Sequence, residues 1–336
     1  MPTMIVNAQH MKNVPGRKTD VKDAEWIAKL LSQGLLRASF IPDREQREFR
    51  ELTRFRKSQM EERARNLNRL QKMLEGANIK FSGVVRDING KSAQSLLELV
   101  VVSESFDISD VQQRMENNIK ASAQELHRAL EGTISPIQRK LLTHLMNIIR
   151  EQTIQIAETE VLIKEYMGCA YRKAVEAICA MPGIGTISAE QIIAEIGVDM
   201  SRFPTAPHLC RWAGICPGNN ESAGKRKNSK TNYANKALKS TLVQCAQSAK
   251  KKKDSFFKAR YERLVVRRGK RRATVAVAHS MLTVIWHVLQ GTAFQDLGYE
   301  YYTRFNREKK IYSYTKQLAK LGLEIPDNLL QQAISA

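Results

Sequence analysis

A serine close to three cations is the first group of residues in this sequence that could catalyse a reaction. Ser222 lies in the polar run 219–227, and Lys225, Arg226 and Lys227 follow it closely. A serine hydroxyl can attack a phosphodiester, and neighbouring cations stabilise the negative charge that develops in such an attack. No histidine stands beside it to act as a base, and most loop serines form turns. The spacing alone therefore leaves Ser222 open as either a nucleophile or a turn former.

Two carboxylates near the amino terminus form a second candidate site. Asp20 and Asp23 are three residues apart at the start of an expected helix, so they share one face of it and can ligate one divalent metal ion. The same positions suit helix capping, with Asp20 as the cap and Asp23 complementing the helix dipole. The local pattern favours capping, because two-metal nuclease chemistry needs about four carboxylates from several elements.

The segment 177–193 fits a helix-hairpin-helix, which is a short turn between two helices. Pro182 ends the first helix, and Gly183 and Gly185 allow a tight turn without clashes at Cβ. Free amides at the start of the following helix would then bind a phosphate of a nucleic-acid backbone. The alternative is a plain turn between two helices without a ligand. The basic surroundings favour contact with nucleic acid.

The excess positive charge is concentrated in one stretch. Residues 225–272 contain eighteen Lys or Arg and two acidic residues, a net charge of +16 in a chain whose formal net charge is +20. This density favours a nucleic-acid partner over a solvated charged face, with an affinity that falls steeply with salt. A membrane surface fits less well, because the stretch is not one amphipathic helix. The cations predicted to contact phosphates are Lys225, Arg226, Lys227, Lys230, Lys250, Lys251, Lys252, Lys253, Arg267, Arg268, Lys270, Arg271 and Arg272.

The elements that must position these residues are expected to be mainly α-helical. Two seams of heptad-like spacing predict a long antiparallel helical hairpin of coiled-coil type over residues 43–168, with short helices between about 91 and 132. The seam positions are Met60, Ala64, Leu67, Gln71 and Leu74 in the first helix, and Leu142, Leu145, Ile149, Gln152, Ile156, Thr159 and Ile163 in the second. We interpret the hairpin as a spacer or dimerisation stalk.

The rest of the chain falls into three further segments. Residues 1–42 contain one expected strand and one helix, which cannot bury a core by themselves. A helical C-terminal domain over 169–290 is expected to carry the serine loop, and 291–336 form a tail. The helices predicted in the C-terminal domain span about 171–181, 188–196, 233–266 and 273–290, with the basic run 267–272 as a loop between the last two.

Composition excludes several classes of protein. The 336 residues are 43% apolar, which is enough for real cores and argues against wholesale disorder. We find no run of about 18 uncharged apolar residues that would predict a membrane span, and no signal peptide. The five cysteines form no CxxC pair and the six histidines show no zinc spacing. We therefore expect free thiols in a reducing cytoplasm and no zinc site.

Four blocks of the sequence, in this order, resemble the insertion-sequence family 110 of transposases, the DEDD/serine recombinases guided by a bridge RNA. The first block is 16–28, which looks like the last two acidic positions of that family. The second is the long helical hairpin. The third is the turn 181–185, and the fourth is 212–217 followed by Ser222, Ala223 and Gly224. The resemblance covers nearly the whole chain.

This resemblance implies a division of labour. A RuvC-like domain of α/β type, of which residues 1–42 would be the C-terminal remnant, would hold Mg²⁺ through Asp20 and Asp23. Ser222 would join covalently to DNA while a structured RNA pairs with target and donor. The implied function is that of a DNA transposase or recombinase, working as a homo-oligomer through the helical hairpin. The implied location is the prokaryotic cytoplasm, in association with the nucleoid.

The N-terminal segment departs from the family pattern. The family's first Asp and its Glu precede the Asp-x-x-Asp helix, whereas only 19 residues, none of them acidic, precede Asp20 here. The comparison predicts a chain that lacks the N-terminal part of its RuvC-like domain and has an incomplete metal site. The alternative function is accordingly a truncated, catalytically inactive protein that still binds nucleic acid. A third class, a structural coiled-coil adaptor for protein partners, conflicts with the charge of 225–272.

Overall fold

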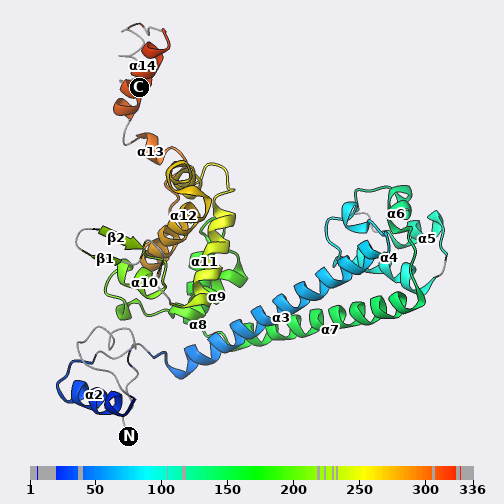
Figure 1. Ribbon diagram of the computed structural model, residues 1–336, viewed down its shortest axis with the longest axis horizontal. Helices are drawn as coiled ribbons and strands as arrows, with labels where there is room; N and C mark the ends of the chain where they lie inside the picture. The colour runs from blue at the N-terminus through cyan, green and yellow to red at the C-terminus, as the bar shows by residue number, and fades with distance from the viewer. Residues whose placement is uncertain are drawn as a thin grey trace. The chain divides into compact units, whose positions relative to one another are not determined.

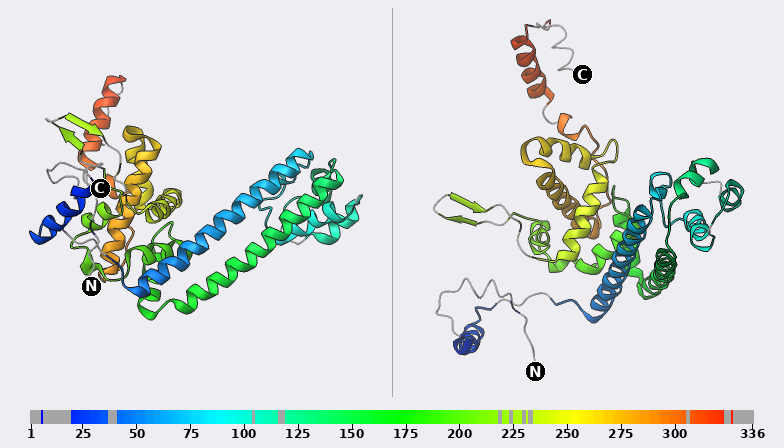
Figure 2. Two further views of the ribbon diagram at one scale, coloured as in Figure 1. Left: turned by 60° about the horizontal axis from the view of Figure 1, so that its bottom comes forward. Right: turned by 45° about the vertical axis from the view of Figure 1, so that its right-hand side comes forward.

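The structure, a computed structural model, describes most of the chain as helices (Figures 1 and 2). The described residues are 6, 20–36, 41–103, 105–115, 119–217, 220–222, 225–228, 231, 234–304, 307–322 and 326. The expected mainly α fold is confirmed for these residues. The chain divides into two compact units. We call Glu51–Met167 the inserted unit, and Met1–Arg50 together with Gly168–Ala336 the terminal unit.

Two long helices of the inserted unit run side by side in opposite directions (Figures 1 and 2). They are α3 (Arg44–Gly76), whose first turns belong to the terminal unit, and α7 (Pro136–Tyr166). Ser135 and Gln138 form a capping box at the start of α7, and Pro136 occupies its first turn, where no amide donor is needed.

The burial of each side chain shows which of the predicted seam positions face the partner helix. Every predicted seam residue of α7 is buried or half-buried. On α3, however, Ala64 and Gln71 are exposed, and the neighbouring Arg63 and Leu70 turn inward instead. The prediction was wrong at these two positions, because α3 is so polar that few apolar residues mark its inner face. Polar pairs contribute there instead, such as the hydrogen bond of 3.1 Å from Asn66 to the Gln152 side chain.

Short helices close the far end of the inserted unit over its hydrophobic core. They are η1 (Phe81–Gly83), α4 (Lys91–Val102), α5 (Ile108–Arg114) and α6 (Ala123–Leu130), which matches the expectation of short helices in this region. The core joins Leu70 of α3, Leu96 of α4, Leu126 of α6 and Leu142 of α7. Arg139 of α7 donates hydrogen bonds to carbonyls at the end of α4, which satisfies acceptors that the helix leaves unpaired.

The terminal unit is built around helix α12 (Phe256–Leu289). Its elements are α2 (Asp20–Ser32), α8 (Cys169–Cys179), α9 (Thr186–Ile196), η2 (Met200–Arg202), α10 (Ala206–Trp212), β1 (Asn220–Ser222), β2 (Lys225–Asn228), α11 (Lys236–Ala249), α12, α13 (Tyr301–Arg304) and α14 (Arg307–Lys320). Val277, Met281 and Ile285 of α12 are fully buried, and α12 packs against α8, α10 and α11. This packing makes the second half of α12 the centre of the core.

The helix predicted over 233–266 is interrupted. Helix α11 ends at Ala249, four lysines follow in a turn, and α12 begins at Phe256 with Ser255 as its N-cap. Asp254 takes a positive φ of 56° in that turn. The loop expected over 267–272 is reduced to one break at Gly269, whose φ of 75° and ψ of 165° no right-handed helix contains. Residues 250–255 contain no apolar residue, so the helical periodicity of the sequence lapses at the first break.

Helix α12 is long and apolar enough to cross a membrane by length and composition alone, with 44% of that stretch buried inside the protein. The sequence had predicted no such span. A core helix of a soluble protein passes the same test, so this single helix is weak evidence for a membrane. Its buried face, described above, accounts for the apolar composition.

Candidate active site and nucleic-acid interface

Ser222 lies at the closed end of a short antiparallel hairpin, which we call the serine hairpin (β1 and β2, Asn220–Asn228). Its α-carbon is paired in register with that of Lys225, and Glu221 is paired with Arg226. The side chains of 218–230 lie outside the described residues, so the backbone alone places them. The fold thus brings the backbone of Ser222 next to that of the first cation of the basic stretch.

The base of the serine hairpin is held by contacts with the start of α11. Pro217 and Thr231 form an isolated antiparallel bridge that closes the base. Lys239 Nζ donates a hydrogen bond to Thr231 Oγ1. Asn235 is the N-cap of α11, and its Oδ1 accepts from the Leu238 amide at 3.1 Å. The base of the serine hairpin is therefore attached to the start of α11.

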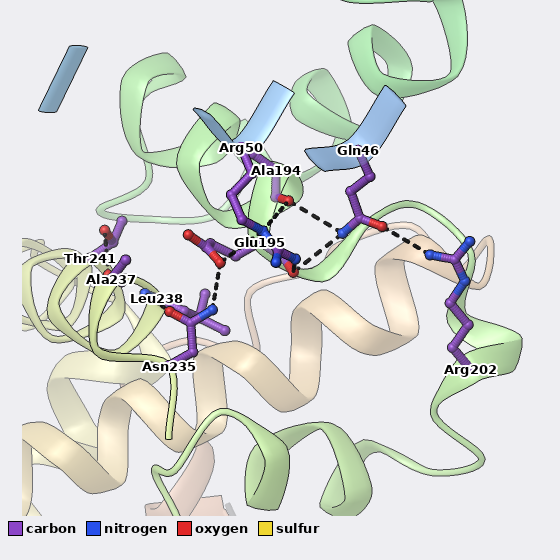
Figure 3. A network of polar contacts seen from close by, with 9 residues as sticks. All are labelled: Gln46, Arg50, Ala194, Glu195, Arg202, Asn235, Ala237, Leu238 and Thr241. Atoms are coloured by element: carbon purple, nitrogen blue, oxygen red, sulfur yellow. Dashed lines mark hydrogen bonds and ion pairs between the residues drawn. The ribbon is translucent and has the colours of Figure 1, made fainter. Parts of the chain in front are cut away.

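A buried acidic residue connects α11 to two other elements (Figure 3). Glu195 of α9 is 2% exposed, and its Oε2 accepts a hydrogen bond from Asn235 Nδ2. Arg50 of α3 lies 3.2 Å from the same oxygen through its Nε, and its Nη2 donates to the Glu195 carbonyl at 2.8 Å. This network was missed in the sequence, although an acid within the apolar run 192–196 is the signal that would have found it.

The first turn of α3 is also bound to η2 and α9. Gln46 donates from Nε2 to the carbonyls of Ala194 and Glu195, and its Oε1 accepts from Arg202 Nη1 at 2.9 Å (Figure 3). Arg202 Nη2 also lies 3.1 Å from Asp43 Oδ2. The Gln46 backbone amide, and then Arg202, hold the pKa of the Asp43 carboxyl below its usual value. The entry of α3 is thereby fixed within the terminal unit.

Gly183 and Gly185 lie in the turn between α8 and α9. Gly183 has a φ of +83° and lies so close to α11 that an added Cβ would meet the Ala249 nitrogen and the Cys245 carbonyl oxygen at 2.5 Å each. Gly185 is the N-cap of α9, is exposed, and has open space where a Cβ would stand. The first glycine therefore serves packing against α11, and the second lies at the exposed start of a helix.

The predicted basic residues that the structure describes lie at two places on the terminal unit. Lys251, Lys252 and Lys253 are exposed in the turn between α11 and α12, and the half-buried Lys250 places its Nζ 4.5 Å from the centre of the Tyr261 ring. Around the Gly269 break, all five cations are exposed, namely Arg267, Arg268, Lys270, Arg271 and Arg272. Lys225, Arg226 and Lys227 are described in backbone only, and Lys230 lies outside the described residues.

Asp20 and Asp23 begin α2, as the sequence predicted, and stand one turn apart on the helix. Their side chains lie outside the described part of the chain. Among the described residues, no group of three or more His, Cys, Asp or Glu is arranged to hold a metal ion. The two aspartates are thus a pair of carboxylates that can supply at most part of a coordination shell.

Comparisons with known proteins bear on both halves of the terminal unit. A family model described as "Transposase IS116/IS110/IS902 family" matches residues 175–262, which contain the α8–α9 turn, the serine hairpin and the lysine turn. A DEDD transposase model of IS110 elements, described as "Transposase", matches residues 1–79. Together the two matches reach every predicted site except the cations around Gly269.

Two curated proteins are similar to the chain over long stretches. One is "Transposase for insertion sequence element IS1111A" of Coxiella burnetii (strain RSA 493 / Nine Mile phase I). It is 24% identical over 300 residues, which is 86% of this chain and 71% of that protein. The other is "Insertion element IS900 uncharacterized 42 kDa protein" of Mycobacterium paratuberculosis. It is 27% identical over 187 residues, which is 54% of this chain and 45% of that protein, so the match spans less than half of the second relative.

Proposed function

Because the chain belongs to the IS110 family of transposases, we propose that it cuts and joins insertion-sequence DNA through a covalent bond between Ser222 and a DNA phosphate. The observation that carries this proposal is the place of Ser222 at the closed end of the serine hairpin, in register with Lys225. The hairpin lies within the segment that the family model matches.

The proposed reaction has two balanced steps. In the first, Ser222 Oγ attacks a DNA phosphorus, its proton passes to a base, and the bond from phosphorus to a deoxyribose oxygen breaks to leave a DNA hydroxyl. In the second, the hydroxyl of another DNA end attacks the phosphoserine and releases the Ser222 hydroxyl. No hydrolysis is needed, so the energy of each broken phosphodiester is retained in the next bond. Lys225, Arg226 and Lys227 follow directly on the chain and supply positive charge for the phosphoryl oxygens.

A divalent cation, Mg²⁺ in our proposal, would be held in part by Asp20 and Asp23. Hard carboxylate oxygens one helical turn apart suit such an ion but fill only part of its coordination shell. When bound, the ion would polarise a phosphoryl oxygen or activate an attacking oxygen. The donor set fits this role in type and spacing, and the remaining ligands would be water, nucleic-acid phosphates or other carboxylates.

The exposed cations of the terminal unit would bind the phosphate backbones of DNA and of a guide RNA. Contacts with phosphates fix position and carry no sequence information, so target choice would rest on base pairing by the RNA. The turn between α8 and α9 would act as a helix-hairpin-helix, with the exposed start of α9 facing a phosphate. The exposure of Lys251–Lys253 and of all five cations around Gly269 supports this part of the proposal.

The inserted unit would join copies of the chain as a coiled coil. Besides its buried seam, α7 exposes large apolar side chains along its length, which is unusual for a helix that only lines a monomer's surface. They are Ile137, Leu141, Ile154, Val161 and Leu162, exposed by 49 to 72%. A second copy packed against α7 would remove those on its contact face from water.

The first test is the covalent intermediate itself. The full chain is incubated with donor and target DNA, the element's RNA and Mg²⁺, and adducts are separated under denaturing conditions. Ser222→Ala should remove at least about 99% of the adduct, since it deletes the attacking oxygen. The matched control is Ser240→Ala, which changes an exposed serine of α11 and should form adduct at the wild-type rate.

Peptide mapping decides between the remaining outcomes. A phosphonucleotide on the peptide that contains Ser222 supports the proposal. Adducts that persist in Ser222→Ala contradict it. Salt-sensitive binding of nucleic acid by the wild-type chain, with Mg²⁺ present and without any strand cleavage, would instead support the alternative of a catalytically inactive nucleic-acid-binding protein.

A further inference from the structure

Among the contacts described above, the buried side chain of Glu195 links three elements near the serine hairpin. They are α9, to which Glu195 belongs, α11 through Asn235, and α3 through Arg50. It extends from an apolar stretch of α9 in which Ile192, Ile193 and Ile196 are fully buried. Burying a carboxylate in such surroundings costs several kcal/mol unless it is paired and hydrogen-bonded. An apolar residue would pack here at lower cost, so the carboxylate has a role that packing does not explain.

The geometry of Asn235 shows what the carboxylate orients. One end of its amide caps α11 by accepting from the Leu238 amide, and the other end donates to Glu195 Oε2 (Figure 3). Because the two ends of an amide differ chemically, both contacts form in one orientation only. Arg50 contacts the same carboxylate oxygen at 3.2 Å, which helps to direct that oxygen toward Asn235.

The fixed N-terminus of α11 in turn bears the base of the serine hairpin. Thr231 lies four residues before Asn235, pairs with Pro217 across the base, and accepts a hydrogen bond from Lys239 in the first turn of α11. The contacts therefore run from Arg50 through Glu195 and Asn235 to Lys239, whose amide donates to the Asn235 carbonyl, and from Lys239 to Thr231 at the base of the hairpin. None of these residues is at the closed end of the hairpin.

We propose that Glu195, acting through Asn235, is a positioning residue that fixes the serine hairpin against α9 and the first turns of α3. This inference rests on the proposed role of Ser222. A displacement of about 1 Å of a reacting group can cost about 100-fold in rate. Loss of the Glu195–Asn235 bond should therefore reduce the rate of adduct formation at saturating DNA while leaving the affinity for DNA nearly unchanged.

A polarity swap tests the bond itself. In Glu195→Gln, the new amide oxygen can take the place of Oε2 and accept from both Asn235 and Arg50, because both donors contact that one oxygen, so this variant should keep the bond. In Asn235→Asp, two carboxylates face each other, although aspartate remains a good cap. In the double variant, the new glutamine donates to the new aspartate, and the hydrogen bond is restored with the same net charge. A double-mutant cycle then isolates this one contact.

Two readouts are measured on the full chain. We expect hydrogen exchange of the backbone amides in 220–231 to rise in Asn235→Asp, to stay near wild type in Glu195→Gln, and to return toward wild type in the double variant. Adduct formation at saturating DNA should slow by about 10- to 100-fold in Asn235→Asp, stay near wild type in Glu195→Gln, and recover in the double variant relative to Asn235→Asp. The DNA dissociation constant should change less than about 3-fold throughout, because neither Glu195 nor Asn235 is among the cations proposed to bind phosphates.

A control separates positioning from general loss of stability. Thr241→Val removes the hydrogen bond of 2.9 Å to Gln191, which joins the same two helices, α9 and α11, farther from the hairpin. It should lower the melting temperature without changing exchange in 220–231. The inference is overturned if Asn235→Asp exchanges and reacts like wild type, or if the double variant is no better than Asn235→Asp. A wild-type chain that forms no adduct contradicts the role of Ser222, and hydrogen exchange still decides the positioning.

Discussion

Gly183 and Gly185 lie two residues apart in the same turn, and only the first is held by close tertiary contacts. The backbone of Gly183 approaches the last turn of α11 so closely that no side chain fits, and its φ of +83° adds a second reason for glycine. Gly185 meets neither condition, because it has open space around it and a φ of −98°. At the residue scale, therefore, the two glycines of one motif have separate physical causes.

This difference predicts opposite effects of substitution. Gly183→Ala should lower the free energy of unfolding by about 3 kcal/mol, the sum of the left-handed backbone penalty and overpacking against Ala249. Gly185→Ser should leave it unchanged or raise it by a few tenths of a kcal/mol, because serine is a good N-cap. Urea denaturation monitored by circular dichroism measures both. Equal losses in the two variants would contradict the contact with α11.

The cysteines make a second prediction at this scale. Burial raises the pKa of the Cys210 thiol to about 11, against a smaller lowering effect from Thr283. Folding thus keeps this thiol protonated, and the stability that it contributes is complete below about pH 9 and is lost as the pH rises toward about 11. At pH 8, a thiol reagent should label the exposed Cys169 in the native chain and Cys210 only after denaturation. Mass spectrometry of labelled peptides reads out both; early labelling of Cys210 would contradict its burial.

At the scale of elements, helix breaks decide where the cations are presented. The turn after Ala249 takes the four lysines out of a helix and exposes three of them, while the break at Gly269 lies within the second basic cluster. A continuous helix would have distributed these charges around its axis, since successive residues are 100° apart. The breaks therefore create two compact groups of cations.

The lysine turn predicts a specific dependence of affinity on salt. Replacing Lys251, Lys252 and Lys253 together with glutamine should weaken DNA binding and reduce the slope of log K against log salt by up to about 0.9 for each phosphate that the lysines no longer neutralise. The matched control replaces three exposed lysines of the inserted unit with glutamine, namely Lys72, Lys91 and Lys140. A fluorescence anisotropy titration at several salt concentrations measures both slopes. Equal slopes in the two variants would show that net charge alone matters.

At the scale of the whole molecule, the chain enters the inserted unit along α3 and leaves it along α7. The two units have separate cores, one beneath α4 and α6 and the other around α12. The terminal unit contains all the predicted chemistry of the chain. The inserted unit carries the apolar residues that are exposed on α7. In our proposal, the terminal unit therefore carries out the chemistry and the inserted unit mediates assembly.

Assembly through α7 can be tested by mass. The chain weighs 38.2 kDa, and light scattering after size-exclusion chromatography should give a multiple of that value for the wild type. Leu141→Glu together with Leu162→Glu should shift the mass toward the monomer, because a charge at a buried contact is costly. Val266→Glu on α12 is the control, since Val266 is equally apolar and 88% exposed but belongs to the terminal unit. An oligomer that survives the double substitution would place the interface elsewhere.

The sequence by itself determined the helical class, the long helix pair and its α7 seam, the start of α2 at Asp20 and the concentration of charge in 225–272. These properties depend on local periodicity, capping and composition, which neighbouring residues specify. Tertiary structure alone decided the inward side of α3 at Arg63 and Leu70, and the reason for glycine at position 183. It also decided the Arg50–Glu195–Asn235 network, because residues 145 and 40 positions apart meet there only once the helices have packed.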